Sequence, residues 1–243
     1  MQAWIFMRKG ENMKNSNETI KRYVSTINEL TAEYNKASEY LLPVCITKGN
    51  SKIGKSLNVS LPAIVSCGNC ADCVHYCYAI ANTIYRGWNG SVIKARARNW
   101  SIFSRNRDLF FNRISYAMDR SKTIRTLRFH VEGEIVDMDH FGRIVKLAAS
   151  HPNWKIWMYS KMDIIVDAYI SKYGPLPSNL SVMRSQWGTN KRVENPYNLG
   201  RFITVLPGEN PPAGVWECPY DCEICKRENR GCIVNETSYV HLH

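Results

Sequence analysis

Hydrophobic and polar positions follow a helical period near the start of the chain. Between residues 17 and 42, apolar side chains recur mostly every three or four positions, which predicts an amphipathic helix. The apolar positions are Ile20, Tyr23, Val24, Ile27, Leu30, Tyr34 and Tyr40. Pro43 cannot continue a helix. We therefore expect this helix to end at residue 42 and to pack as an N-terminal cover.

The middle of the chain changes between short apolar runs and longer helical patterns. Strands are predicted at residues 57–65 and 123–131, where β-forming residues dominate. Between them, the apolar positions from residue 91 to residue 119 predict one long helix, straight or kinked. A short strand at residues 44–47 and a helix at residues 76–85 complete this half of the chain.

The second half alternates strand and helix patterns with short connections. Strand patterns lie at residues 154–159, 180–183 and 202–206, and helical patterns at 137–150 and 163–173. Such alternation predicts right-handed βαβ units and a parallel sheet. The predicted fold class is α/β, a partial or irregular (β/α) barrel with an N-terminal helix and a cysteine-rich C-terminal extension. An open doubly wound sheet is the second choice.

The 243 residues are expected to form one main domain. We divide the chain into an N-terminal helical cover at 1–42, a partial barrel at 43–206 with a cysteine loop at 67–77, and a cysteine-rich metal-binding tail at 207–243. In either α/β fold, loops at the carboxyl ends of strands carry the active groups. Those ends are predicted at residues 67–77, 130–134, 160–161 and 184–187.

The composition fits an ordinary globular protein of a reducing compartment. No apolar run approaches the roughly 18 residues of a membrane helix, and the first residues lack the apolar core and cleavage site of a secretory signal. We therefore expect a cytoplasmic protein without a membrane partner. The chain has nine cysteines, and clustered thiols in a reducing compartment bind metal more often than they form disulfides.

Four of these cysteines lie within the segment Cys67-Gly-Asn-Cys70-Ala-Asp-Cys73-Val-His-Tyr-Cys77. The spacing C-x2-C-x2-C-x3-C allows the thiols to converge in one compact loop. Bacterial ferredoxins hold iron–sulfur clusters with the same spacing, and there the fourth cysteine binds a different cluster. This segment is therefore predicted to bind a metal.

A second group of cysteines follows near the C-terminus. Its members are Cys218, Cys222, Cys225 and Cys232. They supply either missing ligands or a second site, and thiolates suit both zinc and iron–sulfur clusters. Pairing Cys67/Cys70 with Cys222/Cys225 would fit a structural zinc site. The spacing of the first group favours iron–sulfur clusters, one or two and most simply of the 4Fe-4S type, over zinc.

The net charge of +11 suggests an acidic partner such as nucleic acid, because lysine and arginine neutralise phosphates and release counterions. Much of the excess lies in one predicted helical stretch. Its cations are Lys94, Arg96, Arg98, Arg105, Arg107 and Arg113. The alternative is a charged helix face that only contacts water.

Residues 49–56 contain the letters G-x4-G-K-S, which formally match a phosphate-binding loop. A functional loop of that type follows a hydrophobic strand and opens a helix. Here residues 56–62 indicate an extended segment that ends at a proline. We interpret the match as accidental.

Five short segments occur in a characteristic order and spacing between residues 48 and 232. They are Asn50-Ser-Lys52-Ile-Gly54-Lys55, Ser60-Leu-Pro-Ala63, Cys77-Tyr-Ala79, Arg128-Phe-His-Val-Glu-Gly-Glu134 and Trp157-Met-Tyr-Ser-Lys161. Together they resemble the gene product 88 family of phages and prophages. The resemblance implies a cysteine-rich iron–sulfur protein, located in the host cytoplasm if a phage encodes it.

The chain also distantly resembles radical S-adenosylmethionine enzymes, whose partial barrels hold a cluster in a C-x3-C-x-aromatic-C loop. Cys70 and Cys77 have the outer spacing and Tyr76 the aromatic place, but Cys73 comes one residue too early. In those enzymes three cysteines leave one iron open for the cofactor. Four cysteine ligands would close that iron, so the resemblance concerns fold more than reaction.

Gly133 and Glu134 lie where the radical enzymes carry a Gly-Glu motif that holds the amino group of S-adenosylmethionine. By this resemblance both residues bind that cofactor. Glu132 and Glu134 also project to the same side of an extended segment and suit an acid–base pair, with His130 as the second catalytic candidate beside Glu134. The alternatives are a solvated strand end and a half-buried structural histidine.

The leading interpretation is a phage-type iron–sulfur protein that performs redox or radical chemistry if it is an enzyme. Its partner would be a small molecule or a redox protein. Two alternatives stay open. One is a zinc-stabilised nucleic-acid-binding protein that uses the basic helix, and the other is a non-catalytic iron–sulfur protein that transfers electrons.

Overall fold

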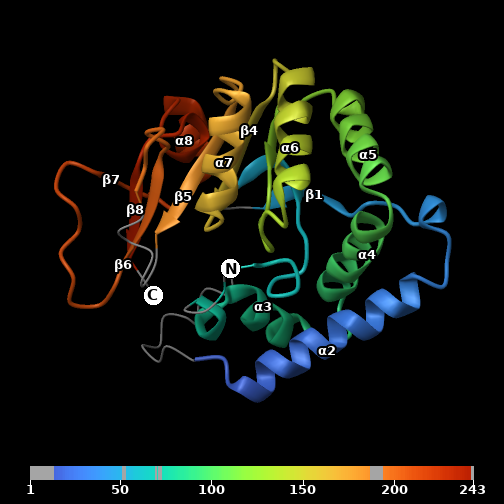
Figure 1. Ribbon diagram of the computed structural model, residues 1–243. Coiled ribbons are helices and arrows are strands. Elements are labelled where there is room, and N and C mark those ends of the chain that lie inside the picture. The colour runs from blue at the N-terminus through green and yellow to red at the C-terminus, as the bar shows by residue number, and fades with distance from the viewer. Residues whose placement is uncertain (1–13, 51–52, 69, 71–72, 187–193, 242–243) are drawn as a thin grey trace.

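The computed structural model describes residues 14–50, 53–68, 70, 73–186 and 194–241. Within these residues the fold is mixed α/β, with one eight-stranded sheet and seven α-helices (Figure 1). The strands are β1 (Ile46–Asn50), β2 (Gly54–Val59), β3 (Thr126–Arg128), β4 (Lys155–Ser160), β5 (Leu180–Gln186), β6 (Arg201–Val205), β7 (Trp216–Glu217) and β8 (Ser238–His241). The α-helices are α2 (Asn17–Tyr34), α3 (Tyr78–Arg86), α4 (Ser91–Arg105), α5 (Arg107–Arg120), α6 (Met138–Ser150), α7 (Asp163–Tyr173) and α8 (Cys222–Glu228). No helix in these ranges is long and apolar enough to cross a membrane.

Neighbouring strands of the sheet follow the chain order almost throughout. The order is β1-β2-β3-β4-β5-β6-β8-β7. Only β1 and β2 pair antiparallel, and the other neighbours pair parallel. A doubly wound sheet requires the order of its strands to reverse part-way across the sheet. Apart from the exchange of β7 and β8 at one edge, the order of the described strands shows no such reversal. The doubly wound alternative is therefore wrong, and the described sheet is open rather than closed into a barrel.

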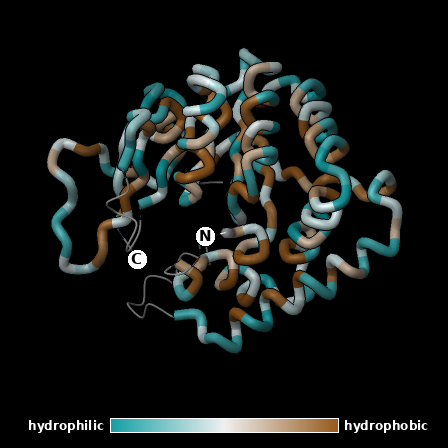
Figure 2. The backbone as a smooth tube through the Cα atoms, viewed as in Figure 1, coloured by the Kyte–Doolittle hydropathy of each residue, from teal (hydrophilic) through white to brown (hydrophobic). Residues whose placement is uncertain are grey.

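One face of the sheet is covered by a row of helices, α5, α6 and α7 (Figure 1). The main core lies between them and the strands, where Ile156 and Met158 of β4 are fully buried. Figure 2 shows hydrophobic residues concentrated along the strands and the helix sides that face them. Because side chains alternate along a strand, Trp157 projects to the other face, where it packs with Ile53 and Ile233.

Helix α2 packs against α3 and α4 and buries Tyr23 completely (Figure 1). It forms the expected cover but ends at Tyr34 rather than at residue 42. A short 3-10 helix, η1 (Glu39–Leu41), follows instead. Arg113 of α5 donates hydrogen bonds to the carbonyl oxygens of Glu39 at 3.2 Å and Tyr40 at 2.7 Å. This contact, distant in sequence, stabilises a turn where the apolar spacing predicted helix.

The long helix predicted from residue 91 to residue 119 is divided into α4 and α5 at Asn106. The backbone there is extended, with φ −152° and ψ 87°, and the Asn106 side-chain oxygen accepts a hydrogen bond from the Leu109 amide at 2.9 Å. Such a cap stabilises the start of a new helix. Asp137 caps α6 in the same way by accepting from the His140 amide at 2.9 Å.

The C-terminal tail joins the same sheet and also contacts its opposite edge. β8 pairs with β6 and with β7. Helix α8 lies against the turn between β1 and β2, where Lys226 donates to the carbonyl oxygens of Ile53 at 2.7 Å and Lys55 at 3.0 Å. Glu223 accepts from the Lys55 amide at 3.0 Å. The tail therefore links the two edges across the face that α5, α6 and α7 leave open.

The glycine–lysine segment at residues 49–56 belongs to this β1–β2 hairpin, of which residues 51–52 lie outside the described ranges. Gly54 has φ +66° and leads into strand β2 rather than a helix. A Cβ atom on Gly54 would overlap the carboxylate of Glu223. The segment therefore lacks the helix that follows a functional phosphate-binding loop, and the glycine is needed where α8 docks.

Candidate metal-binding sites

The first cysteine group, defined as Cys67, Cys70, Cys73 and Cys77, follows β2 at the carboxyl end of the sheet. The short helix η2 (Cys73–Tyr76) and the start of α3 position its last two members. Asn15 is buried beside them and donates to the carbonyl oxygens of Val74 at 3.1 Å and Cys77 at 3.3 Å. No sequence pattern points to Asn15, because its partners lie 59 and 62 positions away.

Two thiols of the first group contact each other directly. The hydrogen bond with Cys70 and burial raise the pKa of Cys67, and the same bond lowers the pKa of Cys70 to about 7. Burial raises the pKa of Cys77 to about 11. Burial also raises the pKa of Cys73, while the positive charge of Lys161 opposes this rise. Lys161 therefore faces the group and favours its thiolate forms.

Glu134 lies next to the first group and is 7% exposed. Its Oε1 accepts hydrogen bonds from the Ser160 hydroxyl at 2.9 Å and the Ile135 amide at 2.8 Å, and its Oε2 accepts one from the Lys161 amide at 2.8 Å. Burial raises the pKa of Glu134, and these hydrogen bonds act against the rise. These three hydrogen bonds occupy three of the about four acceptor positions of a carboxylate.

Gly133 fixes the position of Glu134 through its backbone. It has φ +86°, and a Cβ atom there would lie 2.6 Å from the Ser66 hydroxyl and 2.7 Å from the Leu61 carbonyl oxygen. Only glycine fits such a site without displacement. The Ser66 hydroxyl also accepts from the Glu134 amide at 3.3 Å. Gly133 is thus placed to orient Glu134, and its predicted role in cofactor binding stays a prediction.

Glu132 has different partners from Glu134, and no described hydrogen bond joins the two. Its carboxylate pairs with Arg96 of α4 at 2.7 Å and accepts from Asn82 of α3 at 3.4 Å. Both members of the ion pair are buried. The acid–base pair expected from Glu132 and Glu134 is not formed, because Glu132 ties the segment after β3 to the helices.

His130 is 4% exposed and lies among aromatic rings. Its ring centre is 5.3 Å from that of Phe129 and 5.1 Å from that of His140. Neither ring nitrogen has a hydrogen-bond partner among the described residues. Burial, with the positive charge of Arg96, lowers the pKa of His130 to about 3. The imidazole is therefore neutral and faces the helices α4 and α6.

The second cysteine group consists of Cys218, Cys222, Cys225 and Cys232, on β7, α8 and the 3-10 helix η4 (Gly231–Val234) and their connections. Burial raises the pKa of Cys225 to about 11, and its three fellow thiols add to the rise, so all four are neighbours. The Tyr159 hydroxyl donates to the Cys232 sulfur at 3.1 Å, and the Ser238 hydroxyl lies 3.5 Å from it. The cysteine spacing does not point to Tyr159, which lies 73 positions from Cys232 in the sequence.

The thiols therefore form two separate groups, each from one segment of the chain. The carbonyl oxygen of Cys232 accepts a hydrogen bond from Ser181 near the amino end of β5, whereas the first group faces Lys161, which follows the carboxyl end of β4. The cross-pairing of Cys67/Cys70 with Cys222/Cys225 does not match these neighbours. All nine cysteines lie in the described ranges, and none of them forms a disulfide. In the described ranges, no three His, Cys, Asp or Glu side chains converge as ligands of one ion.

A family model described as gene product 88 matches residues 13–237. The chain belongs to the gene product 88 family. The match includes both cysteine groups and confirms the resemblance carried by the five short segments. No curated protein and no solved structure matches the chain.

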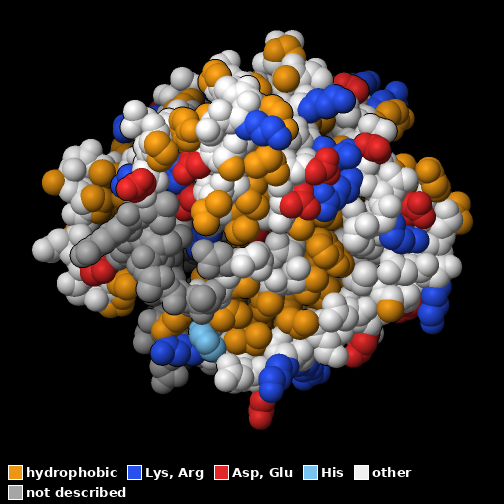
Figure 3. Space-filling model, viewed as in Figure 1, with side chains coloured by type: hydrophobic (Ala, Val, Ile, Leu, Met, Phe, Trp, Pro, Cys, Tyr) orange, Lys and Arg blue, Asp and Glu red, His pale blue; other side chains and the backbone are white. Residues whose placement is uncertain are grey.

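The predicted basic helix of this gene product 88 protein does not present a free positive face. Most of its arginines have partners within the molecule. The partners are Glu132 for Arg96, Cys45 for Arg98, Glu39 for Arg105, Asp137 and Asp139 for Arg107, and backbone carbonyls for Arg113. Figure 3 shows acidic and basic side chains next to one another over α5 and α6. Binding of nucleic acid stays a prediction without this support.

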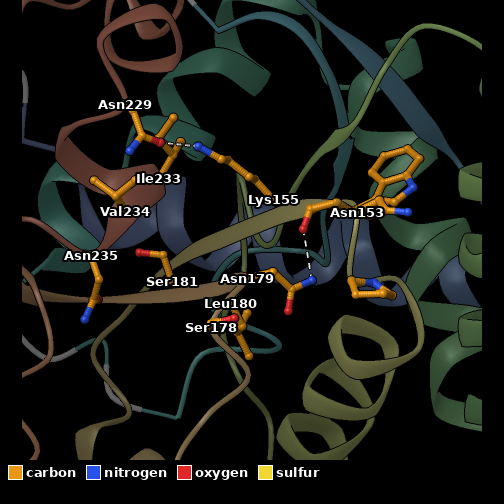
Figure 4. A pocket seen from close by; sticks show the side chains of 12 residues that line it. Asn153, Lys155, Ser178, Asn179, Leu180, Ser181, Asn229, Ile233, Val234 and Asn235 are labelled. Carbon is orange, nitrogen blue, oxygen red and sulfur yellow. Dashed lines mark hydrogen bonds between the residues drawn. The ribbon is translucent and has the colours of Figure 1, made fainter.

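A cleft of about 390 Å³ lies at the amino ends of β4 and β5 (Figure 4). Its polar side chains largely form hydrogen bonds with one another or with the backbone. Lys155 donates to Asn229, and Asn179 donates to the Trp154 carbonyl at 2.9 Å. No predicted site residue of this gene product 88 protein lines the cleft. Because such folds act at the carboxyl ends of their strands, we place no function in this cleft.

Proposed function

We propose that this gene product 88 protein binds iron–sulfur clusters through both cysteine groups and uses the first group for redox or radical chemistry. The observation that carries the proposal is the position of the first group. Its four cysteines follow β2 at the carboxyl end of the sheet, next to Glu134 and Lys161. Parallel α/β folds carry their active groups at this end. Thiolates are soft ligands that suit such clusters.

We further propose that the sheet is a partial barrel. Strands β2 to β6 follow one another in one direction, with α5, α6 and α7 along one face. This winding is typical of barrels, whereas nucleotide-binding sheets reverse their order. The plan is similar to that of radical S-adenosylmethionine enzymes. The similarity supports the fold more than the reaction.

The residues around the first group are suited to bind and orient a small ligand. A cluster bound by Cys67, Cys70, Cys73 and Cys77 would supply one-electron transfer. The carboxylate of Glu134 is suited to an ammonium group, such as the amino group of S-adenosylmethionine, and Gly133 holds Glu134 in place.

His130 has a narrower role within this proposal. Its ring is neutral, buried and surrounded by Phe129 and His140. A group held in this way positions its neighbours and does not take up a proton near neutral pH. We therefore assign proton transfer, if the reaction needs it, to Glu134 rather than to His130.

Metal analysis of protein purified without oxygen tests the proposal. We expect iron, acid-labile sulfide and the broad visible absorption of clusters. Cys70→Ser and Cys225→Ser should each remove part of the iron, because they lie in different groups. Stoichiometric zinc with no iron in either group would contradict the proposal. A change in the EPR spectrum on adding S-adenosylmethionine would separate a radical enzyme from an electron-transfer protein.

A second candidate is structural zinc in the second group. Its four thiols lie within one short tail segment, and Cys232 is hydrogen-bonded from Tyr159. Closed sites with four cysteines are typical of structural zinc. Under this candidate, Cys225→Ser removes zinc while the first group keeps its iron. A zinc-stabilised protein that binds nucleic acid would also show steeply salt-dependent binding, and the internal pairing of the arginines does not favour it.

A further inference from the structure

Arg128, the last residue of β3, lies on the sheet face that α5, α6 and α7 leave open. Its neighbours Leu127 and Phe129 point into the main core, so Arg128 points the other way. Its Cζ atom is 5.0 Å from the centre of the Tyr159 ring, and Tyr159 donates to Cys232 of the second group. Arg128 is thus one side chain removed from the second cysteine group.

Arg128 has no acidic partner among the described residues, unlike the buried arginines of the molecule. Arg96 pairs with Glu132 at 2.7 Å, and Arg184 pairs with Asp163 at 3.1 Å. The Nε atom of Arg128 is shielded from solvent and has no hydrogen-bond partner in the described part of the chain. Polar and charged groups removed from water without partners lower stability. A half-buried arginine of this kind is suited to an anion.

Asn58 adds a second unpartnered group at the same place. It is directly opposite Arg128 in the pairing of β2 with β3, and it is 4% exposed. Its side-chain nitrogen donates to the Ser56 carbonyl oxygen at 3.0 Å, but its side-chain oxygen has no partner in the described ranges. A ligand that accepts from Arg128 and donates to Asn58 would satisfy both.

We infer that Arg128 and Asn58 form a binding site for the phosphate or carboxylate group of a small organic anion with a neighbouring hydroxyl. A guanidinium binds both oxyanions through two parallel hydrogen bonds. Tyr159 and Phe202, whose ring centres are 4.7 Å apart and which are both half-buried, supply an apolar wall for the rest of the ligand. The site does not require a particular metal, so the inference is independent of the proposed function.

A different explanation for Arg128 is that it offsets the negative charge of metal-bound thiolates in the second group. The two explanations differ in a simple way. An anion site binds added phosphate or a hydroxy acid, whereas a counter-ion for thiolates leaves no room for added anions and only affects metal retention.

Calorimetric titration of the metal-containing protein with inorganic phosphate, glycolate and chloride at equal ionic strength tests the inference. Phosphate and glycolate represent the two oxyanion sources, and chloride controls for screening. We expect phosphate or glycolate to bind and to raise the unfolding midpoint, with chloride inactive. Arg128→Gln should weaken binding by about tenfold or more. Arg128→Lys should weaken binding less, because lysine keeps the positive charge but cannot donate two parallel hydrogen bonds from one plane.

Arg120→Gln is the matched control, since it removes the same charge from an exposed position at the end of α5. It should bind as the parent does. Metal content is measured for each variant, so that a loss of metal is not mistaken for a loss of anion binding. The inference is overturned if neither anion binds the parent more strongly than chloride does. It is also overturned if Arg128→Gln binds as well as the parent. If Arg128→Gln fails to fold, the titrations of the parent protein and of Arg128→Lys still test the inferred anion site.

Discussion

The two cysteine groups come from different segments of the chain and have different surroundings. The first group follows β2, faces the charged side chains of Lys161 and Glu134, and depends on a turn that Asn15 holds. The second group belongs to the tail, where Tyr159 donates a hydrogen bond to Cys232. Hydrogen bonds to ligand atoms orient them and tune a metal site. In our proposal, the first cysteine group thus serves the chemistry, and the second closes the fold.

Closure follows from where the tail makes its contacts. Helix α8 carries Cys222 and Cys225 and also carries Lys226, which is bonded to the β1–β2 hairpin. The flanking strands β7 and β8 belong to the opposite edge of the sheet. A metal bound in the second group would therefore hold both edges together, while a metal in the first group holds only a loop.

The largest effect is expected from removing two thiols of the second group. Cys222→Ser/Cys225→Ser should lower the free energy of unfolding by on the order of 5 kcal/mol or prevent folding, because the free energy of metal binding adds to that of folding. Cys67→Ser/Cys70→Ser should remove metal with a smaller loss of stability. Denaturant unfolding and metal analysis measure both. Equal losses in the two double variants would remove the distinction between the groups.

A smaller effect is expected at the buried ion pair that supports the first group. Arg96→Met leaves the buried Glu132 without its ionic partner and should cost about 3–5 kcal/mol. Arg96→Met/Glu132→Leu should recover much of this loss, because no unpaired charge remains. Denaturant unfolding compares the single and double variants. The second group should keep its metal in both variants. Loss of that metal would show that the two cysteine groups are coupled.

The backbone at Gly133 offers a third test of the first group. Gly133→Ala should cost about 2–3 kcal/mol, since strain at positive φ adds to overlap with Ser66 and Leu61. Gly174→Ala is the matched control, because Gly174 has φ +89° but nothing within 4 Å of the added Cβ. Backbone strain alone should make this variant cost about 1–2 kcal/mol. A similar loss in both variants would mean that strain, and not the close approach to Ser66, accounts for the effect.

The smallest effect on stability is expected at Tyr159. Tyr159→Phe removes the hydrogen bond to Cys232 and should cost about 1 kcal/mol. Metal affinity of the second group should fall by about tenfold or more, as for other partners of ligand atoms. Competition with a chelator measures the affinity. Tyr116→Phe, at a 66% exposed position, should change nothing, and an unchanged affinity in Tyr159→Phe would leave the second group without this support.

Apolar spacing along the chain predicted the order of helices and parallel strands well, because core faces repeat locally. It failed where a distant side chain determines the local structure. Helix α2 ends at Tyr34 although apolar residues continue to Tyr40, and Arg113 stabilises the turn that follows. The strands β7 and β8 contain only 2 and 4 residues, too few for an alternating pattern to identify them.

For the sites, sequence spacing predicted which cysteines lie near one another, because the members of each group are close in sequence. Their role as metal ligands stays a prediction. Sequence spacing did not predict the surroundings of the cysteines. The arginines of the expected basic face pair with acids and carbonyls from other elements, and Glu132 pairs with Arg96 rather than acting beside Glu134. Asn15 and Tyr159 have partners about 60 and 73 positions away, which no local pattern encodes.

The bond between Lys226 and Ile53 joins residues that are 173 positions apart, and this separation affects how the chain folds during synthesis. The β1–β2 hairpin emerges from the ribosome early, but its partner helix is made only after most of the sheet. Long-range contacts of this kind slow folding and leave strand edges exposed in the meantime. The sheet face of a nascent chain therefore stays uncovered until α8 is synthesised. If the second group binds metal as we propose, metal supplied to Cys222 and Cys225 at that stage would raise the yield of folded protein.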